Sequence, residues 1–421
     1  MNYQKKLLLL AVMVLLTLGI NGGPGMGIDM IGDTFPITNT IDLYEEQPTV
    51  AYNSQRNYYL VVWTNDRPGN DDIQAQKLAA NGSPIGGPFY ISAGKDHDRW
   101  KPDIAYNSMN DQYLVVWEDF DNASLVTGNS IRARVVTGTG EVQGKSDIII
   151  RAKSSLDTPS DPAVAYASVT NRYLVVWHEV SHVGTPTHRI FGQFINPQGG
   201  LIGGVKEIGK STQLMSPPDV AYSARDNRFM VAWQQFNPTT KNYDVKGQRV
   251  SGDGDLWGPL GTYMDSGSAC EGPVVAAMPN DASDKTYIIA WIHHVPGMNG
   301  YGIVYVNQAG DQRGWSQALS STGTRRHISI AANLNSQTFF IGYQYDTGIM
   351  DKSVWLFQVS AETFWLSDFQ IPGPANDFPV IAAGPTGDYL VVWQGQPLSA
   401  TTTDIYGQIL GIRTYLPMIK K

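Results

Sequence analysis

The sequence of 421 residues has a single cysteine, Cys270, so no disulfide bond can form within the chain. Charged residues are also scarce, at 16% of the chain against about 25% in average proteins. The 30 Lys and Arg are fewer than the 38 Asp and Glu, which leaves no excess of positive charge for binding nucleic acid. Stability must therefore come from a large apolar core or from a closed topology.

An apolar run long enough to cross a membrane is missing as well. The run Leu7–Leu18 is too short, because a membrane-spanning helix needs about 20 apolar residues. Lys5 and Lys6 precede it and a glycine-rich breaker follows, which is the pattern of a secretory signal peptide. We expect residues 1–23 to be this peptide, with an uncleaved anchor as the alternative. The protein is then secreted, to the extracellular space or the cell surface, with no membrane span after signal removal.

Glycine and proline are abundant, with 43 and 24 residues, and no helical pattern of ten residues is visible, which favours an all-β, turn-rich chain. A unit with the motif Pro-x-Val/Ile-Ala-Tyr, followed by Tyr-Leu-Val-Val-Trp, recurs along the sequence. The Val or Ile of this motif, also in its degenerate copies, is found at positions 50, 104, 164, 220, 275, 330 and 381. Seven copies at a near-constant period are typical of a solenoid, a propeller or another repeat array.

Each unit contains four short strand signals, which in the first unit cover residues 49–52, 58–63, 72–78 and 85–91. The second strand is almost entirely apolar, as expected where neighbouring sheets cover both of its faces. Four antiparallel strands repeated around an axis form the blade of a β-propeller. We therefore predict an all-β fold, a seven-bladed β-propeller with four antiparallel strands per blade, as one domain over residues 29–413.

The seventh unit supplies only three strands, the last of them at residues 404–410. Residues 30–38, ahead of the first unit, resemble the fourth strand of that unit at residues 84–92. We predict that residues 31–37 complete the last blade beside strand 404–410, which closes the ring and covers a sheet edge. Residues 414–421 are then a C-terminal tail, and we expect a monomer.

The segments Pro48–Tyr52 and Tyr59–Trp63, with their later copies, resemble the repeats of uncharacterised secreted bacterial seven-bladed propellers. The resemblance covers residues 30–411; it implies the fold and says almost nothing about activity. The ending Thr414–Lys421 resembles the C-terminal tails of many exported Chloroflexota proteins. This second resemblance again implies export.

A tryptophan ends the apolar strand at one position of the repeat, so packing between blades is its simplest explanation. These residues are Trp63, Trp117, Trp177, Trp233, Trp291 and Trp393.

Function is expected where the repeat varies, in loops between second and third strands and in connections between blades. Both kinds of loop lie on one face of a propeller, which we call the long-loop face. The predicted loops cover residues 92–101, 118–129, 151–161, 178–188, 234–243, 292–300, 320–327 and 394–403.

Histidine placement points to the same face, because all seven fall in these predicted loops. They are His97, His178, His182, His188, His293, His294 and His327. Two connections combine histidine with arginine, whose planar fork binds anionic and polar groups, and one of them adds a tryptophan outside the repeated position. The candidate ligand-binding residues are therefore His97, Arg99, Trp100, Arg325, Arg326 and His327.

Candidates for chemistry are fewer. Acid–base catalysis on a glycan needs two carboxyl groups, and Glu118 and Glu179, which follow Trp117 and Trp177, are the candidates. Asp119 and Asp121 are candidate calcium ligands, although no EF-type loop surrounds them. His178 and His182 superficially match a zinc-binding pair, but their spacing is one residue short of His-Glu-x-x-His. No cofactor other than calcium is indicated.

We interpret the chain as a secreted binding module whose long-loop face contacts a glycan, a cell-envelope component or a partner protein. Two alternatives remain open. One is a glycan-active enzyme, a hydrolase or a lyase, with Glu118 and Glu179 at the central mouth. The other is a structural component of the envelope. Binding without turnover and turnover dependent on the two glutamates are the results that separate the first two interpretations.

Overall fold

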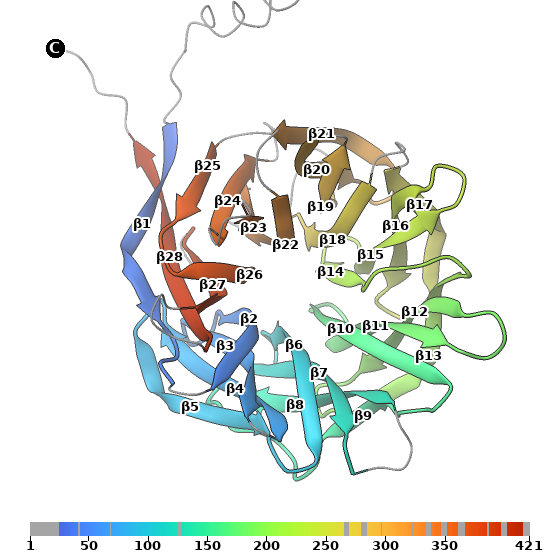
Figure 1. Ribbon diagram of the computed structural model, residues 1–421, viewed down its shortest axis with the longest axis horizontal. Helices are drawn as coiled ribbons and strands as arrows, with labels where there is room; N and C mark the ends of the chain where they lie inside the picture. Colours follow the sequence, from blue (N-terminus) through green and yellow to red (C-terminus); the bar gives the residue numbers. More distant parts are fainter. Residues whose placement is uncertain are drawn as a thin grey trace, which may run out of the picture.

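The computed structural model describes residues 25–40, 43–67, 69–123, 128–264, 269–278, 284–295, 297–320, 324–333, 338–346, 352–360, 367–384, 387–396 and 402–415. The predicted signal peptide, residues 1–23, and residues 416–421 of the predicted tail lie outside this part of the chain. The described strands form seven four-stranded sheets around an axis, without a helix (Figure 1). The predicted seven-bladed β-propeller is confirmed. No helix that could span a membrane occurs among the described residues.

Each of the blades 1 to 6 is formed by four consecutive strands, and blade 7 takes its fourth strand from the beginning of the chain. Blade 1 consists of β2 (Tyr44–Asn53), β3 (Tyr58–Arg67), β4 (Asn70–Ala79) and β5 (Pro84–Ser92). Blade 2 consists of β6 (His97–Asn107), β7 (Gln112–Asp121), β8 (Asn129–Thr137) and β9 (Ile148–Arg151). Blade 3 consists of β10 (Asp157–Ala167), β11 (Arg172–Ser181), β12 (Thr187–Ile195) and β13 (Leu201–Ser211). Blade 4 consists of β14 (Asp219–Ser223), β15 (Arg228–Asn237), β16 (Asn242–Ser251) and β17 (Leu256–Met264). Blade 5 consists of β18 (Ala269–Ala277), β19 (Tyr287–Val295), β20 (Met298–Val306) and β21 (Gln312–Ser320). Blade 6 consists of β22 (Thr324–Asn333), β23 (Thr338–Asp346), β24 (Lys352–Ser360) and β25 (Ser367–Ile371). Blade 7 consists of β26 (Ala375–Ala383), β27 (Tyr389–Gln396), β28 (Asp404–Tyr415) and β1 (Gly25–Pro36).

The core lies between the blades. Each first strand faces the axis and each fourth strand lies at the rim (Figure 1), so the second strand is covered on both sides. Trp117 of β7, for example, packs against Leu60 and Val62 of β3 in the preceding blade. The repeated tryptophans are fully buried in all six blades that carry them. Their predicted role in packing between blades is confirmed.

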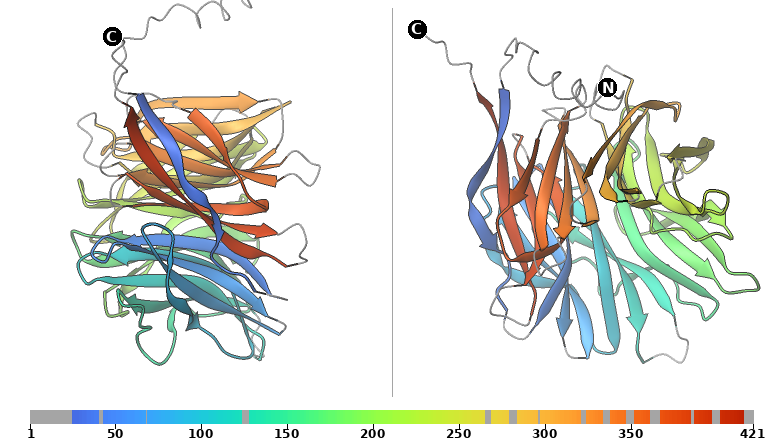
Figure 2. Two further views of the ribbon diagram at one scale, coloured as in Figure 1. Left: turned by 90° about the vertical axis from the view of Figure 1, so that its left-hand side faces the viewer. Right: turned by 45° about the horizontal axis from the view of Figure 1, so that its top comes forward.

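The first and the last described strands lie side by side, and this pairing closes the ring (Figure 2). In the antiparallel register Ile31 pairs with Ile409 and Phe35 with Gly407, which confirms the predicted closure by residues 31–37. The pairing is longer than predicted, because it continues outward to Gly25 opposite Tyr415. The Phe35 ring also lies against Gly82 of blade 1, where a Cβ atom would approach it to 2.6 Å. The N-terminal strand therefore joins blade 7 to blade 1.

A glutamine in the third strand of blades 1, 3, 4 and 7 supports a bulge in the rim strand. In blade 1 the pairing shifts between Ala75 and Lys77, and the Gln76 amide lies 3.3 Å from the carbonyl oxygens of Ile85 and Gly86. The equivalent glutamines are Gln193, Gln248 and Gln408. The bonds stay within one blade, because they satisfy carbonyl groups that the bulge leaves unpaired.

The prediction that every histidine lies in a loop is wrong. Only His182 does; the other six lie in strands, because the strands extend several residues beyond the apolar segments that identified them. Strand β7, for instance, continues to Asp121 and β6 begins at His97, where the sequence predicted loops. The long-loop face is thus formed largely by polar strand ends joined by shorter connections.

Candidate functional site

The inner strand of six blades has a bulge at the repeated proline or its counterpart. In β6 the pairing with β7 shifts between Trp100 and Asp103, and the same shift occurs in β2, β10, β18, β22 and β26. The residue that precedes the proline or its counterpart has a φ between 44° and 56° in these blades. These residues are Gln47, Lys101, Asp161, Gly272, His327 and Phe378. Residues other than glycine adopt this left-handed conformation at a cost of about 1–3 kcal/mol. Such strained residues persist only where the surrounding structure holds them, and they cluster at functional sites.

The neighbouring blade holds the strained backbone in place. The N–H of Asp161 donates to Glu118 Oε2 (3.1 Å), and the N–H of Gly272 donates to Gln234 Oε1 (3.0 Å). The N–H of Gln47 donates to Gln394 Oε1 (3.2 Å). These acceptors all directly follow the repeated tryptophan of the preceding blade. The position after the tryptophan therefore anchors the bulge of the next blade.

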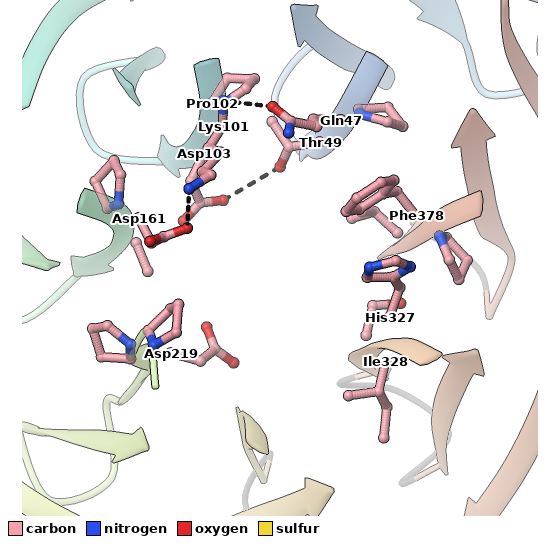
Figure 3. Close-up of a pocket in the computed structure, with 18 residues that line it drawn as sticks. Gln47, Thr49, Lys101, Pro102, Asp103, Asp161, Asp219, His327, Ile328 and Phe378 are labelled. Carbon is pink, nitrogen blue, oxygen red and sulfur yellow. Dashed lines mark hydrogen bonds and ion pairs between the residues drawn. The ribbon is translucent and has the colours of Figure 1, made fainter. Parts of the chain in front are cut away.

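The bulges enclose a cavity of about 460 Å³ on the propeller axis (Figure 3). Its walls are formed by the residues around the repeated prolines of blades 1, 2, 3, 4, 6 and 7. Asp103, Asp161 and Asp219 lie on one side of the opening, and His327 and Phe378 lie on the other. The volume falls within the range of roughly 300–1,000 Å³ that is usual for small-molecule sites.

Two carboxyl groups of the cavity occupy the same position of the repeat, directly after the proline. Asp103 accepts the N–H of Val164 (2.7 Å) and the Thr49 hydroxyl (3.3 Å). Asp219 accepts the N–H of Val275 (2.7 Å), again from the next blade. Burial raises the pKa of Asp103 to about 6 and that of Asp219 to about 7, and the charge of Asp103 adds to the second shift. Both groups can therefore change protonation state near neutral pH.

Lys101, on the same side of the cavity, is already paired with two carboxylates. Lys101 Nζ lies 2.7 Å from Asp161 Oδ1 and 3.4 Å from Glu118 Oε2. Burial raises the pKa of Glu118, which the lysine partly offsets. Since Glu118 also accepts the N–H of Asp161, this glutamate connects blades 2 and 3 from behind the wall of the cavity.

The opposite side of the cavity is aromatic. The His327 and Phe378 rings stack with their centroids 3.9 Å apart. His327 Nδ1 lies 2.5 Å from Asp377 Oδ1 and 3.1 Å from Gln344 Oε1. Lys352 also contacts Asp377, at 3.2 Å. The imidazole is thereby oriented by its own blade and the next one, and Phe378 lies beside it at the cavity (Figure 3).

We expect the protein to lose stability as the pH rises from 5 to 8. Burial raises the pKa of four carboxyl groups: Glu45, Asp71 and Asp219 to about 7 and Asp103 to about 6. The folded chain then binds more protons than the unfolded chain in this range, so stability is lost as the pH passes each folded pKa. Melting temperatures at pH 5, 6, 7 and 8 test this. The double variant Asp103→Asn/Asp219→Asn should show a weaker decline, and a melting temperature that rises from pH 5 to 8 would contradict the assignment.

The first predicted ligand-binding group lies in a buried ion-pair network between blades 1 and 2. Arg99 is 3% exposed and lies 3.2 Å from Asp72 Oδ1 and 3.7 Å from Asp119 Oδ2. His97 Nδ1 contacts Asp119 at 3.1 Å. The half-buried Trp100 donates its indole N–H to Asp71 and lies beside Phe120. These residues are engaged with the scaffold and do not line the axial cavity.

The second predicted group is divided. Arg325 is 8% exposed and lies over three tyrosine rings, with centroid distances of 5.5–5.9 Å. Its Nη1 donates to the carbonyl oxygen of Asn299 (2.8 Å). Arg326 is exposed at the surface. Of this group only His327 lines the cavity.

The structure places the candidate catalytic residues at different positions of the repeat. Glu118 directly follows Trp117, whereas Glu179 is the second residue after Trp177, so the two side chains point to opposite faces of their strands. Glu179 pairs with Arg151 through two contacts of 2.7 and 2.8 Å and accepts the indole N–H of Trp177 (3.2 Å). The two carboxylates do not face each other across one site.

The candidate metal ligands are likewise separated. Asp119 lies 2.9 Å from Arg132 Nε, and Asp121 lies 2.6 Å from Lys153 Nζ. His178 Nε2 lies 3.0 Å from Nδ1 of His188, and burial lowers the pKa of His178 to about 4. His182 contacts Thr158 at 3.3 Å. Nowhere in the described part of the chain do three His, Cys, Asp or Glu side chains come together as a metal site.

Sequence reasoning missed most residues of the cavity. Lys101, Asp103, Asp161, Asp219 and Phe378 were not singled out, although a signal was present. The residue just before the repeated proline or its counterpart is different in each of the seven units, whereas the Val/Ile-Ala pair that follows is kept in all of them. Variation at one position of a repeat marks the surface that is free to bind.

The chain is a β-propeller with a cavity on its axis. No protein-family model and no curated protein matches the chain. A solved structure of a protein of unknown function from Dyadobacter fermentans superposes with a TM-score of 0.54 at 10% identity, covering 92% of this chain and 100% of that chain. A Hadza microbial sialidase gives a TM-score of 0.47 at 11% identity, over 84% of this chain and 76% of its own. An endo-arabinase from Bacteroides thetaiotaomicron gives 0.40 at 14% identity, over 69% and 96%. At 10% identity the first of these likenesses shows the fold alone.

Proposed function

We propose that the chain is a secreted binding module that receives part of a glycan in the axial cavity, from the long-loop face. The observation that carries the proposal is the composition of the two walls. Carboxyl groups of Asp103 and Asp219 line one side, and the Phe378 ring lies on the other (Figure 3). A sugar ring presents hydroxyl groups at its edge and an apolar C–H surface on its face. Carboxyl oxygens on one wall can accept the hydroxyl groups, and an aromatic ring on the opposite wall can pack against the C–H surface.

The rigidity of the cavity supports binding. Backbone N–H groups of neighbouring blades hold both carboxyl groups, and side chains of neighbouring blades hold the strained residues of the bulges. A site whose groups are already fixed loses little conformational entropy when a ligand binds. The surrounding face also offers exposed polar groups, among them Arg326, for contacts with the rest of a chain of sugars.

A second candidate function is hydrolysis of a glycan. The observation that favours it is the pair Asp103 and Asp219, whose pKa values of about 6 and about 7 allow one group to be protonated while the other is ionised. Glycosidases use two such carboxyl groups on either side of the bond that is broken. This pair replaces Glu118 and Glu179 as the candidate acid and base.

The test is a glycan array probed with the chain from Gly25 onward, followed by titration calorimetry with any glycan retained. We expect Asp219→Asn to weaken binding about tenfold or more, because a charge-assisted hydrogen bond contributes roughly 1.5–3 kcal/mol. The matched control is Asp253→Asn, whose carboxylate is 75% exposed in a turn of blade 4. Equal affinity of the parent and the Asp219 variant would contradict the site. If the parent releases new reducing ends from the glycan and Asp103→Asn does not, although this variant still binds the glycan, the result supports the hydrolase instead.

A further inference from the structure

The two cavity carboxyl groups have no positive partner among the residues that line the cavity. Asp103 accepts the backbone N–H groups of Ile104 and Val164 and the Thr49 hydroxyl. Asp219 accepts the N–H groups of Val220 (2.8 Å) and Val275. The cavity has one lysine, Lys101, which is paired with Asp161 and Glu118. Its one histidine, His327, is paired with Asp377. Two half-buried carboxyl groups thus face the cavity without a positive partner among the residues that line it.

From this geometry we infer that the ligand carries a protonated amino group, which binds at the wall formed by Asp103 and Asp219. The inference rests on the proposed function and specifies it: the glycan contains a free amino sugar. An ammonium group supplies the missing positive charge, and its three N–H donors match carboxylate oxygens that backbone N–H groups leave partly unoccupied.

The opposite wall fits the same ligand. Phe378 lies across the cavity from the carboxyl groups, and its ring is stacked on His327. An aromatic ring attracts a cation within about 6 Å of its face and also packs against the C–H surface of a sugar. An amino sugar presents an ammonium group and such a surface on one ring, so a single residue of the glycan can contact both walls.

A bare metal ion fits the wall less well than an organic cation. Calcium takes 6–8 oxygen ligands, whereas Asp103 and Asp219 belong to different blades, and the carboxylate of Asp161 in blade 3 is already paired with Lys101. Their oxygens already accept backbone N–H groups. An ammonium group needs fewer contacts, and the cavity of about 460 Å³ leaves room for the sugar to which it belongs.

The experiment compares two oligosaccharides of equal length that differ only at the nitrogen: a β-1,4-linked glucosamine oligomer and its fully N-acetylated counterpart. Titration calorimetry is carried out at pH 7, where part of the glucosamine nitrogen is protonated and Asp103, with a pKa of about 6, is largely ionised. We expect the free amine to bind at least tenfold more tightly. The double variant Asp103→Asn/Asp219→Asn should lose this preference, and Asp253→Asn should retain it. Thermal melting of each variant shows that the fold is intact.

The outcomes separate the inference from the proposed function. Equal binding of both oligomers overturns the amino-sugar inference and leaves the glycan site standing. Binding of neither oligomer also overturns it, and the glycan array then decides whether any sugar is recognised. A lysine hexapeptide is the third ligand. If it binds as tightly as the glucosamine oligomer, the site selects a charged amine and the inference of a sugar is wrong.

Discussion

A chain that begins at Thr38, and therefore lacks β1, is expected to melt roughly 10 °C or more below a chain that begins at Gly25. The loss removes the entire pairing with β28, from Gly25 opposite Tyr415 to Pro36 opposite Tyr406. It also removes the Phe35 ring that lies against Gly82 and Gly407. Circular dichroism at rising temperature measures the effect.

The same truncation should make the protein associate. Without β1 the N–H and C=O groups of β28 form an open sheet edge, which pairs readily with another chain. Size-exclusion chromatography with light scattering detects this. The variant Phe35→Ala is the milder control, since it keeps the strand and removes only the ring. If the shortened chain has the same melting temperature as the chain that begins at Gly25 and elutes as a monomer, the pairing of β1 with β28 does not stabilise the ring.

The variant Arg99→Ala is expected to lower the free energy of unfolding by about 1.5–3 kcal/mol, the usual contribution of hydrogen bonds to charged groups. Arg99 lies between Asp72 and Asp119, and both carboxylates are almost completely buried. Its Nη1 also lies 3.2 Å from the carbonyl oxygen of Asp71. Removal of the guanidinium takes away this donor and one of the cations at each carboxylate, while Arg67 still contacts Asp72 and Arg132 still contacts Asp119. The fold should therefore be affected before any ligand is added. Denaturant titration measures the loss.

The matched control is Arg326→Ala on the same face. Its side chain is exposed, so the expected change in stability is within about 0.5 kcal/mol. The comparison separates two roles that the sequence could not separate. If Arg99→Ala keeps its stability and loses a glycan that the parent retains, Arg99 is a ligand-binding residue after all, and the ion-pair network is not important for the fold.

The number of blades and the closure were predictable because both depend on local patterns. Apolar runs such as Tyr59–Trp63 identify a strand covered on both sides, and their period gives the number of blades. The missing strand of the seventh unit could be matched to residues 31–37 from the similarity to residues 84–92 alone. Neither inference required knowledge of which blades touch.

The cavity was not predictable in the same way, because the bulge breaks the alternation of side chains at Lys101-Pro102 and its equivalents. Beyond the bulge the polar ends of the strands resemble loops, so His97 and His178 were assigned to loops. The partners of Arg99 are separated from it by 20 to 27 residues and come from two blades. Pairings of this kind follow from how blades pack, which no single repeat encodes.

The pairing of β1 with β28 also sets the order in which this fold is completed. During synthesis β1 leaves the ribosome before every other described strand, and β28 leaves after them all. Blades 1 to 6 can each assemble from consecutive strands as they emerge, but β1 has no partner until the seventh blade exists. Contacts between such distant segments form slowly. The finished ring therefore appears only after β28 has been made, and until then β1 remains available to other chains.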